Sequence, residues 1–182
     1  YRSGRNQESG KSMKNHNFGI LFILLVIAQM IICNYFQMTP YIVLSILPAM
    51  ILCIPLTVST NVCMLIAFAS GLTVDWLAEG LIGINAASLV PVAMARKTII
   101  SIFLGEDLIA RQDSFTFKKN GIGKISIALF ASLAIFFAIY IILDGAGTRP
   151  YSFNLIRFTA SVTASLALSL VVSAVLIPDD RK

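Results

Sequence analysis

Two carboxylates are the residues whose types and spacing best suggest chemistry in this sequence. Asp75 and Glu79 lie four positions apart within the apolar part of the chain, so on a continuous helix they would share a face. Two acids one helical turn apart inside a membrane can carry protons or cations. The surrounding residues favour another interpretation, because Trp76 is a typical interfacial anchor and Gly80 and Gly83 indicate a turn. We therefore predict a loop or a protein contact here, with ion coupling as the alternative.

Other groups that could do chemistry are few. His16 is the single histidine, and no Ser-His-Asp set or metal-ligand spacing accompanies it. Residues 10–12 read Gly-Lys-Ser, but Arg5 stands where a phosphate-binding loop needs its first glycine. Unpaired cysteines in or beside apolar runs predict free, buried thiols, namely Cys33, Cys53 and Cys63. We expect no enzymatic activity, no cofactor and no metal.

A series of serines at four-residue intervals marks the last apolar run. These residues are Ser161, Ser165, Ser169 and Ser173, and alanines lie close by. Small side chains let helix backbones approach closely in a membrane, where this is a common packing device. The spacing predicts a helix-packing face, which contacts either another helix of this chain or a partner.

The composition places these residues in a membrane protein. Of the 182 residues, 57% are hydrophobic and 13% are charged, whereas soluble domains carry about 25% charged residues. The charges are bunched between long apolar runs, which is typical of membrane-spanning segments. The net charge is +5, and the basic residues flank the apolar runs without forming a patch with interleaved aromatic residues. Lipid headgroups are therefore more plausible counter-ions than nucleic acid.

The apolar runs predict an all-α, polytopic membrane protein with six transmembrane helices. The second carries Pro48 and Pro55, which predict kinks. Together the helices form one membrane domain over residues 18–177. The predicted spans are 18–36, 41–58, 62–77, 81–95, 125–143 and 158–177.

The fourth span has two possible ends. In the first interpretation it ends before Arg96 and Lys97, and residues 98–111 form an amphipathic helix in the membrane interface. In the alternative it continues to Leu104 and places two cations within the membrane, at a cost of several kcal/mol unless they reach the interface.

The distribution of Lys and Arg predicts the orientation. All but two of the 14 basic residues lie on one side of the predicted topology, and the exceptions are Arg149 and Arg157. By the positive-inside rule, the segment 1–17, the loop 96–124 and the tail 178–182 are cytoplasmic. Because Met13 followed by Lys14 resembles a translation start, we expect residues 1–12 to be upstream or added sequence.

The segment from Gly71 to Ser88 reads Gly-Leu-Thr-Val-Asp-Trp-Leu-Ala-Glu-Gly-Leu-Ile-Gly-Ile-Asn-Ala-Ala-Ser. It resembles the bacterial rod shape-determining protein MreD family, in which Gly-x-x-x-Asp ends the third span and a glycine-containing turn leads into a fourth span rich in small residues. The matching positions are Gly71, Asp75, Gly83, Asn85, Ala86 and Ala87; many relatives have His at the position of Asn85. The resemblance covers nearly the whole chain from Met13.

This resemblance implies a non-enzymatic subunit of the cell-elongation complex in the bacterial inner membrane, supporting peptidoglycan synthesis and cell shape. Its implied partners are an MreC-like membrane protein and, beyond it, MreB, RodA and a transpeptidase penicillin-binding protein. The family also resembles the substrate-binding S-components of energy-coupling-factor vitamin transporters, which share a six-helix architecture. A vitamin-binding subunit is therefore the alternative function.

These comparisons lead to a hypothesis for the candidate residues. We expect Asp75 to position the third and fourth helices, either by capping or by a hydrogen bond to a neighbouring helix. We expect the transmembrane helices to pack against the MreC-like partner, and the loop that begins at Arg96 to contact lipid headgroups or cytoplasmic proteins. The residues named for structural or partner-binding roles are Gly71, Asp75, Glu79, Gly83, Asn85, Arg96, Ser161, Ser165, Ser169 and Ser173.

Overall fold

The computed structural model describes residues 3–36, 41–80, 82–105, 121–145 and 149–176; of residues 3–17, 36 and 79 it describes the backbone alone. Within these ranges the chain is helical and contains no strand. Five of its helices are long and apolar enough to cross a membrane, so the chain is an all-α, multi-pass membrane protein. A sixth transmembrane helix, as predicted from the sequence, is not confirmed in the described part of the chain.

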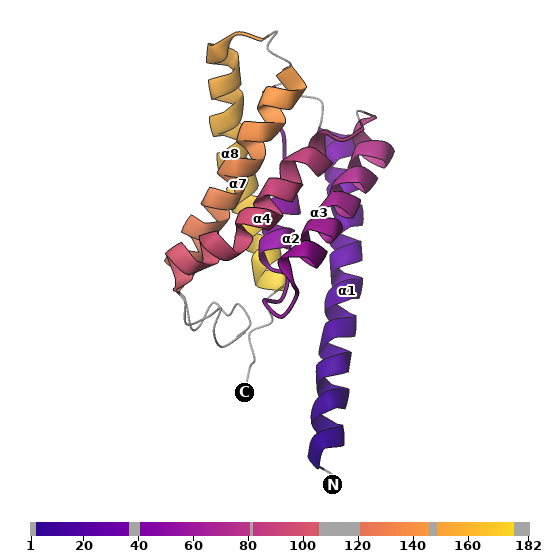
Figure 1. Ribbon diagram of the computed structural model, residues 1–182. Helices are drawn as coiled ribbons and strands as arrows, with labels where there is room; N and C mark the ends of the chain where they lie inside the picture. The colour runs from indigo at the N-terminus through magenta and orange to yellow at the C-terminus, as the bar shows by residue number, and fades with distance from the viewer. Residues whose placement is uncertain (1–2, 37–40, 81, 106–120, 146–148, 177–182) are drawn as a thin grey trace.

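The long helices pack around a short one (Figure 1). They are α1 (Ser3–Phe36), α3 (Thr60–Val74), α4 (Ile84–Leu104), α7 (Ile122–Gly145) and α8 (Tyr151–Leu176). The start of α1 and the end of α8 lie towards one end of the bundle, and the connections from α3 to α4 and from α7 to α8 lie at the other.

The main correction to the sequence prediction concerns the second transmembrane helix. Of residues 41–58, only α2 (Leu47–Leu52) is helical. Proline explains both limits of this helix: Pro48 lies at its start, where a missing N–H costs nothing, and Pro55 lacks the N–H that would extend it. The prolines therefore break this segment instead of kinking it.

The interrupted segment lies in the interior of the protein. Every residue of α2 is buried, and α2 contacts α1, α3, α4, α7 and α8. Figure 1 shows it in the middle of the bundle. The core is thus built around a piece of chain whose backbone is largely without helical hydrogen bonds.

The third and fourth helices meet in a tight joint. After Val74 the helix widens into one π-helical turn, η1 (Asp75–Glu79), which Gly80 ends in the left-handed conformation with φ 71°. Gly83, at φ 102°, precedes α4. Both positions favour glycine, because a side chain there would be strained.

The fourth helix follows the alternative interpretation. It does not end before Arg96 but continues to Leu104, with Arg96 at 1% exposure and Lys97 exposed. The part of the predicted interfacial helix up to Leu104 therefore belongs to α4, and residues 106–111 lie outside the described ranges. At the far end of the chain, α8 begins seven positions earlier than expected, which places Arg157 inside the helix.

Candidate functional site

The carboxylate of Asp75 is the centre of the joint between α3 and α4. The side chain is fully buried. Its Oδ1 accepts hydrogen bonds from the backbone N–H of Asn85 at 3.0 Å and from the Asn85 side-chain amide at 2.9 Å. Its Oδ2 accepts from the N–H groups of Gly83 at 2.9 Å and Ala86 at 3.2 Å. Asp75 thus caps the first turn of α4, where the helix has unsatisfied donors and positive dipole charge.

Gly71 allows this contact by bringing the two helix backbones together. A Cβ atom at this position would lie 2.6 Å from the Cα of Ala86 and 2.7 Å from its N. No backbone can yield to such a contact without separating the helices. Because Gly71 and Asp75 are four residues apart, both lie on the face of α3 that meets the start of α4.

The chemistry of this joint is that of a structural clamp. All four contacts to the carboxylate come from N–H donors fixed at the start of α4. A carboxylate that accepts several such bonds is held in one orientation. The geometry therefore fits the role that the sequence suggested for Asp75 in positioning these helices.

A second polar arrangement satisfies the backbone of the interior segment. On one side, Ser161 Oγ accepts from Val43 N at 2.9 Å, and Ser165 Oγ accepts from Ser45 N at 3.1 Å and donates to Val43 O at 3.5 Å. On the other side, Gln29 of α1 accepts from Ile46 N at 2.8 Å and donates to Leu44 O at 3.0 Å.

These contacts supply the hydrogen-bond partners that a non-helical backbone needs inside a membrane. A non-helical backbone at membrane depth must find hydrogen-bond partners within the protein, since hydrocarbon supplies none. Side chains from α1 and α8 supply them, alternating along residues 43–46. Gln29 and the first two serines therefore hold the interior segment between the two helices.

Arg96 serves the other end of the segment. Its Nε donates to the carbonyl of Leu52 at 3.3 Å, and its Nη2 donates to the carbonyl of Ile54. Helix ends carry free carbonyls with partial negative charge, and Pro55 prevents the next turn from using them. The buried cation thus terminates α2 and joins it to α4.

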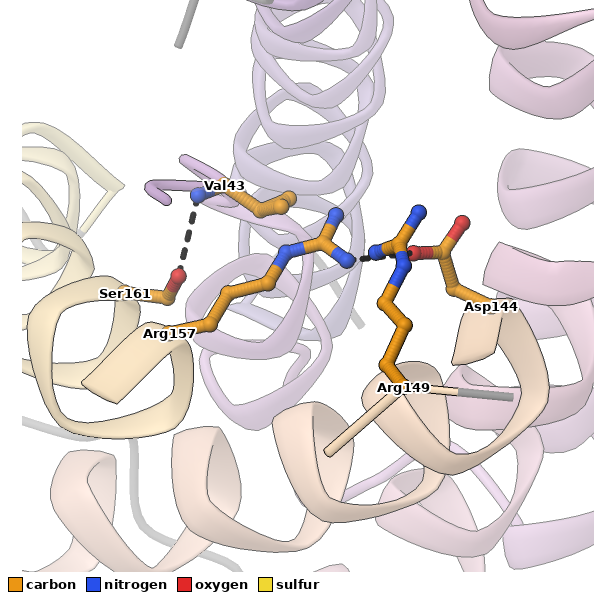
Figure 2. Close-up of polar contacts among 5 residues, drawn as sticks. All are labelled: Val43, Asp144, Arg149, Arg157 and Ser161. Carbon is orange, nitrogen blue, oxygen red and sulfur yellow. Dashed lines mark hydrogen bonds and ion pairs between the residues drawn. The ribbon is translucent and has the colours of Figure 1, made fainter. Parts of the chain in front are cut away.

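A third polar cluster joins α7 to α8 (Figure 2). Asp144, near the end of α7, forms ion pairs through Oδ2 with Arg149 at 2.9 Å and with Arg157. The Arg149 guanidinium also lies 5.7 Å from the centre of the Phe153 ring. Arg157 is only 7% exposed, and one turn further along α8 Ser161 contacts Val43. We call Asp144, Arg149 and Arg157 the α7–α8 clasp.

The structure divides the predicted residues between separate places. Gly71, Asp75, Gly83 and Asn85 come together at the α3–α4 joint. Glu79 ends η1, and its side chain lies outside the described part. Arg96, Ser161 and Ser165 contact the interior segment instead.

The remaining two serines do not contact that segment. Ser169 is buried, and its hydroxyl has no hydrogen-bond partner among the described residues. Ser173 donates to the Leu170 carbonyl of its own helix. The four-residue spacing correctly indicated a buried face, since all four serines are 0% exposed.

Sequence reasoning missed Gln29 and the α7–α8 clasp. Gln29 was visible as a strongly polar residue within the first apolar run, which is a signal for an interior contact. Arg149 and Arg157 entered the prediction only through the count of basic residues. Their ion pairs with Asp144 depend on α8 beginning at Tyr151, which places the three charges near one another.

Among the described residues, no group of three or more His, Cys, Asp or Glu side chains lies close enough to hold a metal ion. The three cysteines are buried and form no disulfide with one another. Comparisons with known protein families, with curated proteins and with solved structures find no match.

Proposed function

We propose that this chain is a non-enzymatic membrane subunit of the bacterial cell-elongation complex that supports peptidoglycan synthesis by binding an MreC-like membrane protein. The proposal places it in the cytoplasmic membrane with both termini in the cytoplasm. The chain would cross the membrane six times, as in the six-helix architecture of the S-components. The interior segment 41–58 would make the one crossing that is not a continuous helix. MreB, RodA and a transpeptidase penicillin-binding protein are the further partners in this proposal.

The α3–α4 joint is the observation that carries the proposal. The residues on which the MreD resemblance rests, Gly71, Asp75 and Asn85, form a single contact. Their role there is to fix one helix against the next, since the carboxylate is buried among donors of its own chain. A rigid helix pair whose acid at position 75 is buried against its own chain suits a protein that binds other membrane proteins.

The outer face of this helix pair offers a surface for a partner helix. Large apolar side chains on α3 and η1 are exposed, including Leu65 at 68%, Phe68 at 49% and Trp76 at 72%. Leu65, Phe68 and Trp76 follow helical spacing, so they face the same side. In a membrane such a face contacts lipid or another helix, and we propose that the MreC-like partner packs here.

Depletion in a rod-shaped bacterial host tests the proposed function. Cells should become rounded, and the tagged protein, purified in mild detergent, should carry an MreC-like protein with it. Normal cell shape together with a co-purified ATPase-driven coupling module would overturn the proposal in favour of the vitamin-transporter alternative. Stabilisation of the purified protein by a vitamin at micromolar concentration would point the same way.

The substitution Asp75→Ala tests whether the α3–α4 joint is required for partner binding. It should abolish co-purification of the partner, because the start of α4 loses the acceptor for four hydrogen bonds, while membrane insertion persists. Thr73→Val is the matched control, since the Thr73 hydroxyl is exposed and donates to the Ala69 carbonyl of its own helix. Unchanged co-purification by Asp75→Ala would contradict the assignment.

A further inference from the structure

The α7–α8 clasp contains more positive than negative charge. Two guanidinium groups share one oxygen of a single carboxylate, which leaves a net charge of one positive unit in the cluster. A guanidinium also has more N–H donors than one carboxylate oxygen can use. Figure 2 shows both arginine side chains converging on Asp144.

Arg157 places part of the net positive charge of the clasp in a buried position. It is 93% buried by exposed area, and its Nε has no hydrogen-bond partner among the described residues. A buried cation with unused donors is costly unless an anion completes its contacts. Arg149, by contrast, has a side chain that is 40% exposed, so a ligand can approach the cluster from its side.

The clasp lies at an end of the bundle where aromatic residues gather. Tyr151 is 94% exposed and Tyr41 is 49% exposed, and the Tyr41 ring lies 5.2 Å from Phe153, on which Arg149 rests. Tyrosine and tryptophan are enriched at the level of lipid headgroups. The start of α8, with its partial positive charge, adds to the same field.

We propose that the α7–α8 clasp binds a phosphate group, either that of an anionic lipid headgroup or free phosphate. Arg149 contacts the phosphate with its exposed edge, and Arg157 supplies the second guanidinium from beneath it. Paired N–H donors of arginine match phosphate oxygens in geometry and charge. Asp144 positions both arginines and competes with the ligand. This inference does not depend on the proposed partner.

Native mass spectrometry of the full chain, released from mild detergent, provides the test. Wild-type protein should retain phosphatidylglycerol, and Arg149→Gln should reduce the retained fraction about tenfold, as loss of one charge-assisted contact implies. Lys97→Gln is the control, because Lys97 is an exposed cation on α4, outside the clasp. A parallel thermal-unfolding titration with inorganic phosphate distinguishes the sources: saturable stabilisation would identify free phosphate as a ligand.

Asp144→Asn separates ligand binding from a purely structural role. Removing the competing carboxylate should increase retention of phosphatidylglycerol or stabilisation by phosphate, whereas a clasp that only joins α7 to α8 predicts no gain. Circular dichroism checks that each variant is folded. Equal retention and equal phosphate response in wild type, Arg149→Gln and Asp144→Asn would overturn the proposal.

Discussion

The two joints at one end of the bundle use an aspartate in opposite ways. At the α3–α4 joint, Asp75 is fully buried and accepts only from backbone and amide N–H groups of the next helix. At the α7–α8 clasp, Asp144 is partly exposed and pairs with two arginines. The first joint is complete within the chain, and the second retains positive charge and unused donors.

The difference shows how one residue type can serve architecture or recognition. Backbone donors at a helix start cannot leave their positions, so Asp75 is bound to one geometry. Arginine side chains are longer, and Arg149 is reached by solvent, so the clasp can exchange one contact for another. A carboxylate with fixed donors stabilises a fold. A carboxylate paired with two arginine side chains leaves guanidinium donors that a second anion can use.

Replacing each aspartate by asparagine should have the largest and most unequal effects. Asp75→Asn would turn an amide N–H₂ towards N–H donors and should lower the free energy of unfolding by roughly 3 kcal/mol or more. Asp144→Asn should cost less, about 1–2 kcal/mol, because the asparagine Oδ1 can still accept from an arginine and the Arg149 side chain is 40% exposed. Reversible denaturation in mixed micelles measures both. Equal losses would break the comparison, and a stable Asp75→Asn protein that lost a pH-gradient-dependent activity would instead support proton coupling.

A smaller effect is expected where the helices of the complete joint touch. Gly71→Ala places a Cβ atom 2.6 Å from the Ala86 Cα and should cost about 1–3 kcal/mol through forced separation of α3 and α4. Gly123→Ala is the matched control, since nothing lies within 4 Å of the added atom in α7. The same denaturation assay applies. A Gly71→Ala protein as stable as the control would show that the close approach is not required.

The smallest expected effect concerns the serines of α8 beyond the clasp. Ser165→Ala removes the acceptor of Ser45 N and should cost about 1 kcal/mol. Ser169→Ala should be nearly neutral, because the Ser169 hydroxyl lacks a hydrogen-bond partner among the described residues although both serines are fully buried. Denaturation midpoints of the two variants compare them directly. Identical midpoints would mean that the serines act by their small size alone.

Much of the membrane fold was predictable because apolar length and helix formation are local properties. The first and fifth predicted spans lie inside α1 and α7, and residues 158–176 of the sixth lie inside α8. The second predicted span was expected to be a transmembrane helix and is not a continuous helix. Hydropathy cannot distinguish a transmembrane helix from an apolar segment whose backbone is satisfied by other side chains. Pro48 and Pro55 were noted as sources of kinks, but whether the helix kinks or breaks depends on the partners available to it.

The candidate site was predictable to a similar extent. The pair Gly71 and Asp75 was selected from spacing and resemblance, and the contact with Asn85 follows from the short turn between them. The clasp and the role of Gln29 were not predicted, because the clasp depends on where α8 begins and Gln29 depends on how the interior segment folds back against α1. Asp144 and Arg157, for example, meet only because α7 and α8 pack as antiparallel neighbours.

Hydrophobic runs and helix-end signals act within a few residues, so they were enough to predict a helical membrane protein with a polar turn near Asp75. Packing of the helices was needed to show that residues 41–58 lie as an interrupted segment in the core. Its backbone is satisfied there by Gln29, Arg96, Ser161 and Ser165. The physical reason is that hydrocarbon offers no hydrogen bonds. A backbone that leaves the helix must therefore find its partners wherever the other helices bring them.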